Sequence, residues 1–573
     1  MRVSGHTLSM GCSPGRFALL SLLVLAACSD GGGAGGAGAS GGGDGGVGGA
    51  LELPDPLGPL PPAASGESDR FVTSGACAQC HLSSEEVPLE DAAAQDLSPV
   101  GLWRTSMMAL SARDPFYLAV FSHELDALGG APLVEAACSR CHAPAASVER
   151  EPLGSSFADL TTDTSDLGHL ARDGVTCSLC HQLLDSEIGS PATISGVFSV
   201  GASREIFGPH QNPDPAPMEF FVGFTPTFSE HVARAELCAG CHTVVTPILA
   251  EDGTPTDELF VEQAAFFEWE NSAASESGSC GDCHMPRREA DGSPTSSPLA
   301  TYPEGLMTRS PIGRHSFAGA NAWVQNLIAD DVAWAGVSVS EEELRAAAAT
   351  SEEHLGTAAE VAILSAELEG GALVCDVRVR NKTGHKLPTG YPTRRVWLHV
   401  VATDAGGVVL FESGAYDTNG AILGADGQPL DLSTPLPHEQ QIAGPDDVLV
   451  YELVPLDRSG AVAHRPLAAV SVGKDNRLLP YGWREAYPWI DWIAPRGVEG
   501  DANFIGGSDR VEVLIGAGGA VARVDVELLY QTISPETLAA LARVPTPAAV
   551  RFSQMAAARP PLPTVLARAS LER

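Results

Sequence analysis

The chain has 573 residues, which exceeds one ordinary domain and predicts two or more compact units. Its 44% hydrophobic and 18% charged residues are typical of a globular protein rather than a disordered one. Acidic residues outnumber basic ones 72 to 34, and the formal net charge is −38. This balance argues against nucleic acid as a partner and against direct binding to an anionic membrane surface, whereas cationic partners would be attracted.

Residues 1–27 have the pattern of an export signal. Arg16 precedes the apolar run FALLSLLVLAA, which is too short to span a bilayer as a permanent helix. The end of this segment resembles the lipobox of bacterial lipoproteins, which implies cleavage before Cys28 and lipidation of its thiol. The alternative is a plain signal peptide with Cys28 near the junction by chance. We therefore expect a lipoprotein on the periplasmic or outer-surface face of a bacterial membrane, held there by a lipid anchor only.

Residues 28–68 are expected to be a tether. The first part is glycine-rich and cannot bury enough apolar surface to fold, and the second part is proline-rich and should be stiffer. Such a segment would hold a folded domain away from a membrane.

Five copies of the pattern CxxCH follow within about 210 residues, and each is typical of a covalent haem c attachment site. Cysteines three apart lie on one face of a helical turn, so both thiols can reach the two vinyl groups of one porphyrin. The next residue then presents an imidazole to the iron. The five motifs are Cys77, Cys80 and His81; Cys138, Cys141 and His142; Cys177, Cys180 and His181; Cys238, Cys241 and His242; and Cys280, Cys283 and His284.

Zinc sites and disulfides are the competing interpretations of these cysteines. Zinc would not require a histidine directly after each pair, and disulfides would require none. Because all five pairs are followed by histidine, five haem c groups are the expected cofactor, with the five motif histidines as proximal iron ligands.

Distal iron ligands have to come from other histidines, or from methionines. His123 lies on an apolar helix face that follows Asp114 and Pro115, where a histidine can equally be a packed core residue. The other candidates lie in loops or precede a CxxCH motif. They are His169, His210, His231, His315 and His385.

The sequence predicts a multidomain chain, in which a mainly helical and irregular cytochrome domain is followed by a β-sandwich. Five porphyrins in about 250 residues would themselves form the core of the first domain. Seven segments with alternating hydrophobicity predict the sandwich. We expect the haem domain at 69–320, a helical linker at 321–357, the sandwich at 358–531, and a C-terminal helix with a proline-rich tail at 532–573.

Several motifs together resemble exported multihaem c-type cytochromes of the cytochrome c-552/c-554 and hydroxylamine oxidoreductase-like group. They include DGVTCSLCHQL, FGPH, ELCAGCHTVVTP, VEQAAFFEWENS and CGDCHMP. The segment from residue 384 on, GHKLPTGYPTRRVWLHVV, is similar to a β-rich C-terminal domain that some of these cytochromes carry. The resemblance implies mostly bis-histidine haems in close contact, which act as an electron wire or, in some members, as oxidoreductases.

The sequence is compatible with three functions. The first is a lipid-anchored pentahaem electron carrier with protein redox partners, which the acidic charge of the chain predicts to be cationic. The second is an oxidoreductase with one open haem that acts on a small nitrogen or sulfur compound. This chain departs from pentahaem nitrite reductases, whose active-site motif has lysine in place of histidine. The third is a binding protein whose sandwich docks a partner.

Residues 381–395 gather unusual positive charge for so acidic a chain, with two of its three lysines on either side of His385. A solvated loop between strands is one interpretation. The other is that the loop reaches back to the haem domain, with His385 as a distal ligand. Haem propionates would then be offset by nearby cations, the candidates being Lys382, Lys386, Arg394 and Arg395.

Overall fold

The computed structural model describes the chain from residue 53 onward, except for residues 92, 131, 151–160 and 517. The predicted export signal, Cys28 and most of the expected tether lie outside the described residues. Residues 52–573 form one compact unit. Within the described residues, no helix combines the length and the apolar character needed to cross a membrane.

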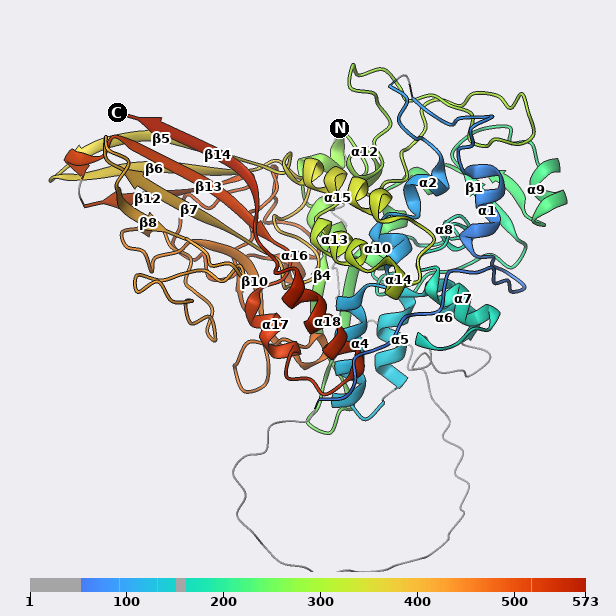
Figure 1. Cartoon of the computed structure of the whole chain (residues 1–573), viewed down its shortest axis with the longest axis horizontal. Coiled ribbons are helices and arrows are strands. Elements are labelled where there is room, and N and C mark those ends of the chain that lie inside the picture. Colours follow the sequence, from blue (N-terminus) through green and yellow to red (C-terminus); the bar gives the residue numbers. More distant parts are fainter. Residues whose placement is uncertain (1–52, 92, 131, 151–160, 517) are drawn as a thin grey trace, which may run out of the picture. The chain divides into compact units, whose positions relative to one another are not determined.

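Up to residue 358 the described chain consists mainly of short helices joined by loops (Figure 1). Two small sheets interrupt the helices: β1 (Glu205–Gly208) pairs in parallel with β2 (Thr225–Phe228), and β3 (Thr243–Leu249) pairs antiparallel with β4 (Pro255–Ala264). The helices are α1 (Ser74–His81), α2 (Pro99–Trp103), α3 (Met107–Leu110), α4 (Pro115–Ala127), α5 (Pro132–His142), α6 (Pro144–Arg150), α7 (Asp166–Arg172), α8 (Cys177–Cys180), α9 (Ala216–Phe221), α10 (Glu236–His242), α11 (Ala265–Glu270), α12 (Cys280–His284), α13 (Ala322–Asp330), α14 (Val332–Ala335) and α15 (Glu341–Leu355).

Side-chain caps explain where two of the longer helices begin. Asp114 precedes α4, and its carboxylate accepts the backbone N–H of Phe116 at 2.8 Å, while Pro115 occupies the first helical position. Ser340 and Glu343 form a reciprocal capping box at the start of α15. The beginning of α4 agrees with the expectation from sequence.

A β-sandwich forms most of the chain after residue 358, as expected (Figure 1). One sheet has the order β11-β10-β7-β13-β14, with β8 paired to β7, and the other has the order β5-β6-β12-β9. Side chains of both sheets meet in one buried cluster. The strands are β5 (Ala359–Glu369), β6 (Ala372–Asn381), β7 (Arg395–Thr403), β8 (Val409–Ser413), β9 (Gln441–Ile442), β10 (Val450–Leu456), β11 (Ser471–Asp475), β12 (Ser508–Ile515), β13 (Arg523–Gln531) and β14 (Thr564–Glu572).

The C-terminal segment differs from the expected single helix and proline-rich tail. It forms two helices, α17 (Pro535–Leu541) and α18 (Pro547–Ala558), and then the strand β14. β14 pairs antiparallel with β13 along almost its whole length. The prolines at 560, 561 and 563 therefore mark the turn into a strand, not an unstructured end.

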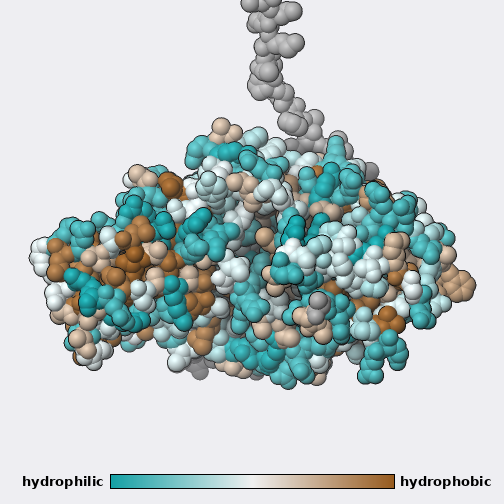
Figure 2. Space-filling view, turned by 90° about the horizontal axis from the view of Figure 1, so that it is seen from above, coloured by the Kyte–Doolittle hydropathy of each residue, from teal (hydrophilic) through white to brown (hydrophobic). Residues whose placement is uncertain are grey.

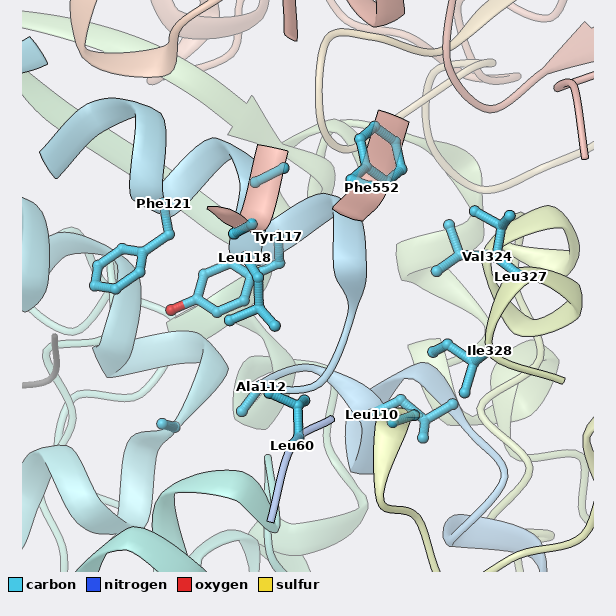
Figure 3. Packing of buried hydrophobic residues seen from close by; sticks show 14 of the residues in the cluster. Leu60, Leu110, Ala112, Tyr117, Leu118, Phe121, Val324, Leu327, Ile328 and Phe552 are labelled. Atoms are coloured by element: carbon cyan, nitrogen blue, oxygen red, sulfur yellow. The ribbon is translucent and has the colours of Figure 1, made fainter. Parts of the chain in front are cut away.

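The core of the helical part lies where α4, α13 and α18 meet. Tyr117 and Leu118 of α4, Leu327 of α13 and Phe552 of α18 belong to one buried cluster (Figure 3). Because α18 comes from the C-terminal segment, the two ends of the described chain share this core. The short α16 (Ile490–Ile493) belongs to a separate aromatic cluster with α11.

Most of the surface in the view of Figure 2 is hydrophilic, in keeping with the acidic composition. Hydrophobic side chains gather on this face over the β-rich part, at the left of the picture. Leu364 and Leu368 of β5 are among the exposed large hydrophobic residues of the sandwich.

Candidate functional site

All five CxxCH motifs lie on helical turns. They end α1, α5 and α10, fill α12, and occupy α8 with His181 as its C-terminal cap. The two thiols of each motif therefore lie on one face of a helix, as the covalent attachment of a porphyrin requires. None of the eleven cysteines of the described chain is in a disulfide.

The motif histidines have the hydrogen bonds of iron ligands. A carbonyl oxygen can only accept, so an imidazole nitrogen bonded to it must carry the proton, and the other nitrogen keeps a free lone pair. The Nδ1 atom of four motif histidines is bonded in this way, which leaves Nε2 available. The pairs are His81 with the carbonyl of Leu299 at 2.7 Å, His142 with Ser111 at 2.9 Å, His181 with Phe207 at 2.7 Å and His284 with Ala318 at 2.7 Å.

Burial favours the neutral form of four motif imidazoles, which is the form that binds a metal. It lowers the pKa of His142 and of His242 to about 4. The pKa of His81 and that of His181 are lowered for the same reason.

The motifs are connected to one another through their cysteines. The thiol of Cys77 in the first motif lies close to that of Cys177 in the third, and this proximity raises the pKa of Cys77. A contact between Cys141 and Cys241 likewise joins the second motif to the fourth.

The fourth motif is the branch point of this arrangement. Its first cysteine, Cys238, lies close to Cys280 of the fifth motif and raises the pKa of that thiol. Its second, Cys241, lies close enough to Cys180 of the third motif to raise the pKa of that thiol. The five motifs therefore form one connected, branched set.

Two of the candidate distal histidines face a motif histidine at a distance that suits an iron between them. The ring centroids of His315 and His181 are 6.3 Å apart, and those of His385 and His284 are also 6.3 Å apart. Two metal–nitrogen bonds of about 2.0 Å, with about 1.1 Å from each nitrogen to its ring centre, give about 6.2 Å. Both distal candidates have Nδ1 near a backbone carbonyl, that of Gly313 or that of Lys386, at 3.0 and 2.8 Å.

The other four candidate histidines, all in the described part of the chain, do not face a motif histidine at such a distance. Both ring nitrogens of His231 are hydrogen-bonded, to Ser229 Oγ at 2.6 Å and to the carbonyl of Leu183 at 2.7 Å. In this arrangement neither nitrogen of His231 is free to bind iron. His169 has its Nδ1 3.5 Å from a guanidinium nitrogen of Arg172.

His123 and His210 lie next to arginines. Burial, with a smaller effect of the charge of Arg465, lowers the pKa of His123. Burial also lowers the pKa of His210, and the charges of Arg309 and Arg287 add to it. His354, at the end of α15, is 5.1 Å from the His284 ring, which is too short for an iron between the two rings.

The loop at 381–395 packs against the helical part, as one of the two interpretations predicted. A Cβ atom on Gly384 would come within 2.9 Å of the Ala274 Cβ and 3.0 Å of the Trp269 ring, so only glycine fits there. The loop thereby brings His385 from the sandwich to the fifth motif.

Three of the four cations of this loop are paired with protein carboxylates, which differs from the expected role beside propionates. Lys382 pairs with Glu360 at 3.4 Å, Lys386 with Asp475 at 2.6 Å, and Arg395 with Glu536 at 3.4 Å. Because the pair of Lys386 with Asp475 is buried, the positive charge of Lys386 stabilises the fold of the protein.

Arg394 is the cation of this loop that lies nearest to the motif histidines. Its guanidinium donates to the carbonyl of Thr389 and to Asn321 Oδ1. Burial is the main cause that lowers the pKa of His242 and of His385, and the charge of Arg394 adds to it in both. Arg394 therefore lies near both the fourth and the fifth motif.

Two tyrosines near the second motif were not expected from sequence. The Tyr117 ring stacks on the His142 ring, with centroids 3.8 Å apart and planes 5° from parallel. Tyr391 packs edge-on against Phe116, the neighbour of Tyr117, at 5.7 Å. The sequence indicated the position of Tyr117 only indirectly. The Asp114 cap predicts the start of a helix, and Phe116 and Tyr117 lie in the first turn of that helix, α4.

No family model and no curated protein matches this chain. Among solved structures, the chain is similar to a penta-heme cytochrome c552 from Thermochromatium tepidum, with 18% sequence identity and a TM-score of 0.49. The likeness covers 88% of this chain and all of that one.

Proposed function

We propose that this chain is a pentahaem c-type cytochrome that carries electrons between redox partners. The observation that carries the proposal is that all five CxxCH motifs are linked through their cysteines into one branched set. Haem c supplies reversible one-electron transfer at iron, with a potential set by axial ligands, burial and nearby charge. Groups attached to linked motifs would lie close enough to exchange electrons along the set.

The chain's own residues would hold each group in three ways. The paired thiols form the covalent links, the motif histidines provide the proximal ligands, and backbone carbonyls fix their tautomer through Nδ1. His315 would complete the coordination of the third group and His385 that of the fifth.

In this proposal the sandwich is part of the cytochrome. His385 and Arg394 come from the loop between β6 and β7, and both face the fourth and fifth motifs. A sandwich that served only to dock a partner would not need to place a neutral, carbonyl-bonded imidazole beside His284.

The proposal includes export and a lipid anchor at Cys28, which the lipobox-like sequence supports. The acidic surface would favour a cationic redox partner and make that association sensitive to salt. Expression of the full chain and of Cys28→Ala, followed by membrane fractionation, tests the anchor. We expect the native chain in the membrane fraction and the variant in the soluble exported fraction, and equal distribution would contradict the anchor.

The main experiment is a haem count. Mass spectrometry of the purified full chain, exported in a host that makes c-type cytochromes, should show five haem groups that remain attached after denaturation. A pyridine haemochrome assay should give the same ratio of haem to chain. Attached zinc, or free thiols at the motifs, would contradict the proposal.

A further inference from the structure

Three aromatic side chains form an exposed patch on the helical part. Phe220 and Phe221 belong to α9 and Tyr302 to the loop after the fifth motif, and the three residues are 82%, 52% and 51% exposed. Their rings meet edge-on, with centroids 4.9 Å apart for Phe220 and Phe221 and 5.5 Å apart for Phe221 and Tyr302. Figure 1 shows α9 at the right-hand edge of the molecule, opposite the sandwich. Large aromatic residues that contact one another at a surface are typical of a protein interface.

This aromatic patch is attached to the first haem motif. His81 Nδ1 donates to the carbonyl of Leu299 at 2.7 Å, and the backbone N–H of Thr301 donates to the carbonyl of Cys80, also at 2.7 Å. Tyr302 follows directly in the chain. The segment that fixes the tautomer of His81 therefore also carries one ring of the patch.

The third motif is connected to the same patch. His181 Nδ1 donates to the carbonyl of Phe207 at 2.7 Å, and the Phe207 N–H donates back to the carbonyl of His181 at 2.7 Å. Phe207 lies on β1, which pairs with β2, and α9 lies between these two strands in the chain. The two motifs also meet, because the thiol of Cys177 is 3.3 Å from Ser74 Oγ of α1. A partner on the patch would thus lie beside two of the five haem motifs.

Exposed carboxylates flank the aromatic patch. Asp214 precedes α9, Glu219 lies on α9, and Glu304 follows the third ring of the patch by two residues. Glu219 accepts from the Thr225 hydroxyl at 3.0 Å, which leaves its charge in place. A cation, Arg309, lies nearby and donates to two backbone carbonyls just before α9. The acidic rim would attract a partner with positive charge around an apolar centre, and would repel an anionic lipid surface or a second copy of this acidic chain.

We propose that the aromatic patch is the docking surface for a redox protein whose contact face is apolar at its centre and rich in lysine or arginine at its rim. On docking, one electron passes between the metal centre of this partner and the iron at the first motif. When the partner is the donor, its centre is oxidised by one electron, the iron changes from ferric to ferrous, and no atom is transferred. The inference rests on the proposed function, because it requires a haem at Cys77 and Cys80.

A basic cytochrome c with zinc in place of iron is a suitable probe, because lysines surround the exposed edge of its porphyrin. A laser flash excites this porphyrin to a triplet state, which decays faster when it loses one electron to a ferric haem. We would add the oxidised, full-length pentahaem protein at several salt concentrations. The decay should accelerate with the concentration of that protein, and the bimolecular rate constant should fall as salt increases. The same probe with acetylated lysines should react more slowly.

Variants of the patch test the named aromatic residues. Phe220→Ala and Phe221→Ala should each lower the bimolecular rate constant about tenfold, the loss expected for a central aromatic residue of an interface. Because both residues are more than half exposed, the changes should leave the haem count and the unfolding curve as they are in the native chain. The matched control is Leu368→Ala on β5 of the sandwich, a residue that is 54% exposed.

A second comparison tests the acidic rim. Asp214→Asn combined with Glu219→Gln should lower the rate constant several-fold at low salt and weaken its dependence on salt, because two attractive charges are lost. Glu367→Gln combined with Glu369→Gln is the matched control. Both of these residues are exposed on β5, so this pair of changes removes the same total charge at the other end of the molecule.

Four results would overturn the docking surface. The first two are an unchanged decay of the probe at low salt, and equal rate constants for the native chain, the patch variants and the controls. Binding of the Cys28→Ala protein to lipid vesicles that is lost in Phe220→Ala would assign the patch to a membrane. A dimer in sedimentation that Phe220→Ala dissociates would assign it to a second copy. Each result is compatible with five attached haems, whereas a chain without them would overturn the proposed function instead.

Discussion

Lys386 Nζ lies 2.6 Å from Asp475 Oδ2, and the lysine side chain is wholly buried. Arg477 donates to the same carboxylate at 2.7 and 2.8 Å and pairs with Glu268 of α11 at 2.9 Å. The Lys386 backbone N–H also donates to Glu268, at 3.2 Å. Two cations and two anions thus join the loop of His385, strand β11 and helix α11 in one neutral network.

Removal of one charge from this network should be costly, because the remaining charges stay buried. We expect Lys386→Met to lower the free energy of unfolding by about 3 to 5 kcal/mol, measured by denaturant titration of the pentahaem protein. Since Lys386 follows His385 and its carbonyl fixes the His385 tautomer, the variant should also show a changed haem spectrum.

Lys382→Met is the control from the same loop. Lys382 is 41% exposed and pairs with Glu360 at 3.4 Å, so its loss should cost less than about 1 kcal/mol. Equal effects of the two substitutions would show that the buried network does not hold the loop.

The distal ligand assignment predicts the effect of two single substitutions. His315→Ala and His385→Ala should each convert one haem of five from low spin to high spin, because each removes the imidazole that faces a motif histidine at 6.3 Å. Electron paramagnetic resonance and carbon monoxide binding to the reduced protein would measure this change. The double variant should show two such haems.

His399→Ala serves as the comparison. The ring of His399 lies on β7 between Glu412 and Glu527, with nitrogen–oxygen distances of 3.0 and 3.4 Å, so we expect its loss to leave all haem spectra unchanged. If all haems of the His385→Ala protein stay low-spin, His385 is not a distal ligand and the 381–395 loop has a purely structural role.

Local patterns made part of this architecture predictable from sequence. Each of the seven segments with alternating hydrophobicity contains a strand, because alternation reflects a strand with one buried face. Strand β14 was missed because the prolines before it were interpreted as a tail, although Ala567, Ala569 and Leu571 alternate. The strand can be recognised only when it is known that β13 needs a further partner at that edge of the sheet.

The candidate site was predictable only where the chemistry is local. The geometry of a CxxCH motif depends only on its own five residues. His385 and His284, in contrast, come together from different parts of the fold. The cationic loop was correctly singled out, but the carboxylates that pair with it lie far from it in sequence.

The position of Arg394 predicts an effect on redox potential. A positive charge near the fourth and fifth motifs favours the reduced iron, which carries one charge less. Arg394→Gln should therefore lower the potential of one or two haems. One charge several ångströms away is worth roughly 1 to 2 kcal/mol in a protein, or some tens of millivolts for one electron.

Potentiometric titration followed by optical spectroscopy measures this shift. Arg345→Gln is the control, because Arg345 lies on α15 in exposed pairs with Asp330 and Glu341. The prediction fails if both variants shift the potentials equally, or if Arg394→Gln raises them.

A buried group in the sandwich predicts how stability depends on pH. Burial raises the pKa of Asp509 to about 7, and the charge of Asp501 adds to this effect. The Asp509 carboxylate accepts from the Tyr451 hydroxyl at 2.8 Å and from the Arg510 backbone at 2.7 Å, and His438 Nε2 is 3.6 Å away.

Asp509 should destabilise the fold as pH rises. Between the unfolded pKa near 4 and the folded pKa near 7, the folded state holds a proton that the unfolded state has lost, so stability falls with increasing pH across this window. Asp509→Asn removes this loss. Relative to the native chain, the variant should therefore gain up to about 4 kcal/mol between pH 4 and pH 8.

Denaturant unfolding at several pH values gives this difference directly. Asp114 and Asp173, whose pKa values are also raised by burial, to about 6, titrate in both proteins and cancel in the comparison. The pKa of His438 is lowered by burial, so its titration favours the fold as pH rises and has the opposite sign. Parallel curves for the native chain and Asp509→Asn would show that Asp509 is already ionised in the fold at low pH.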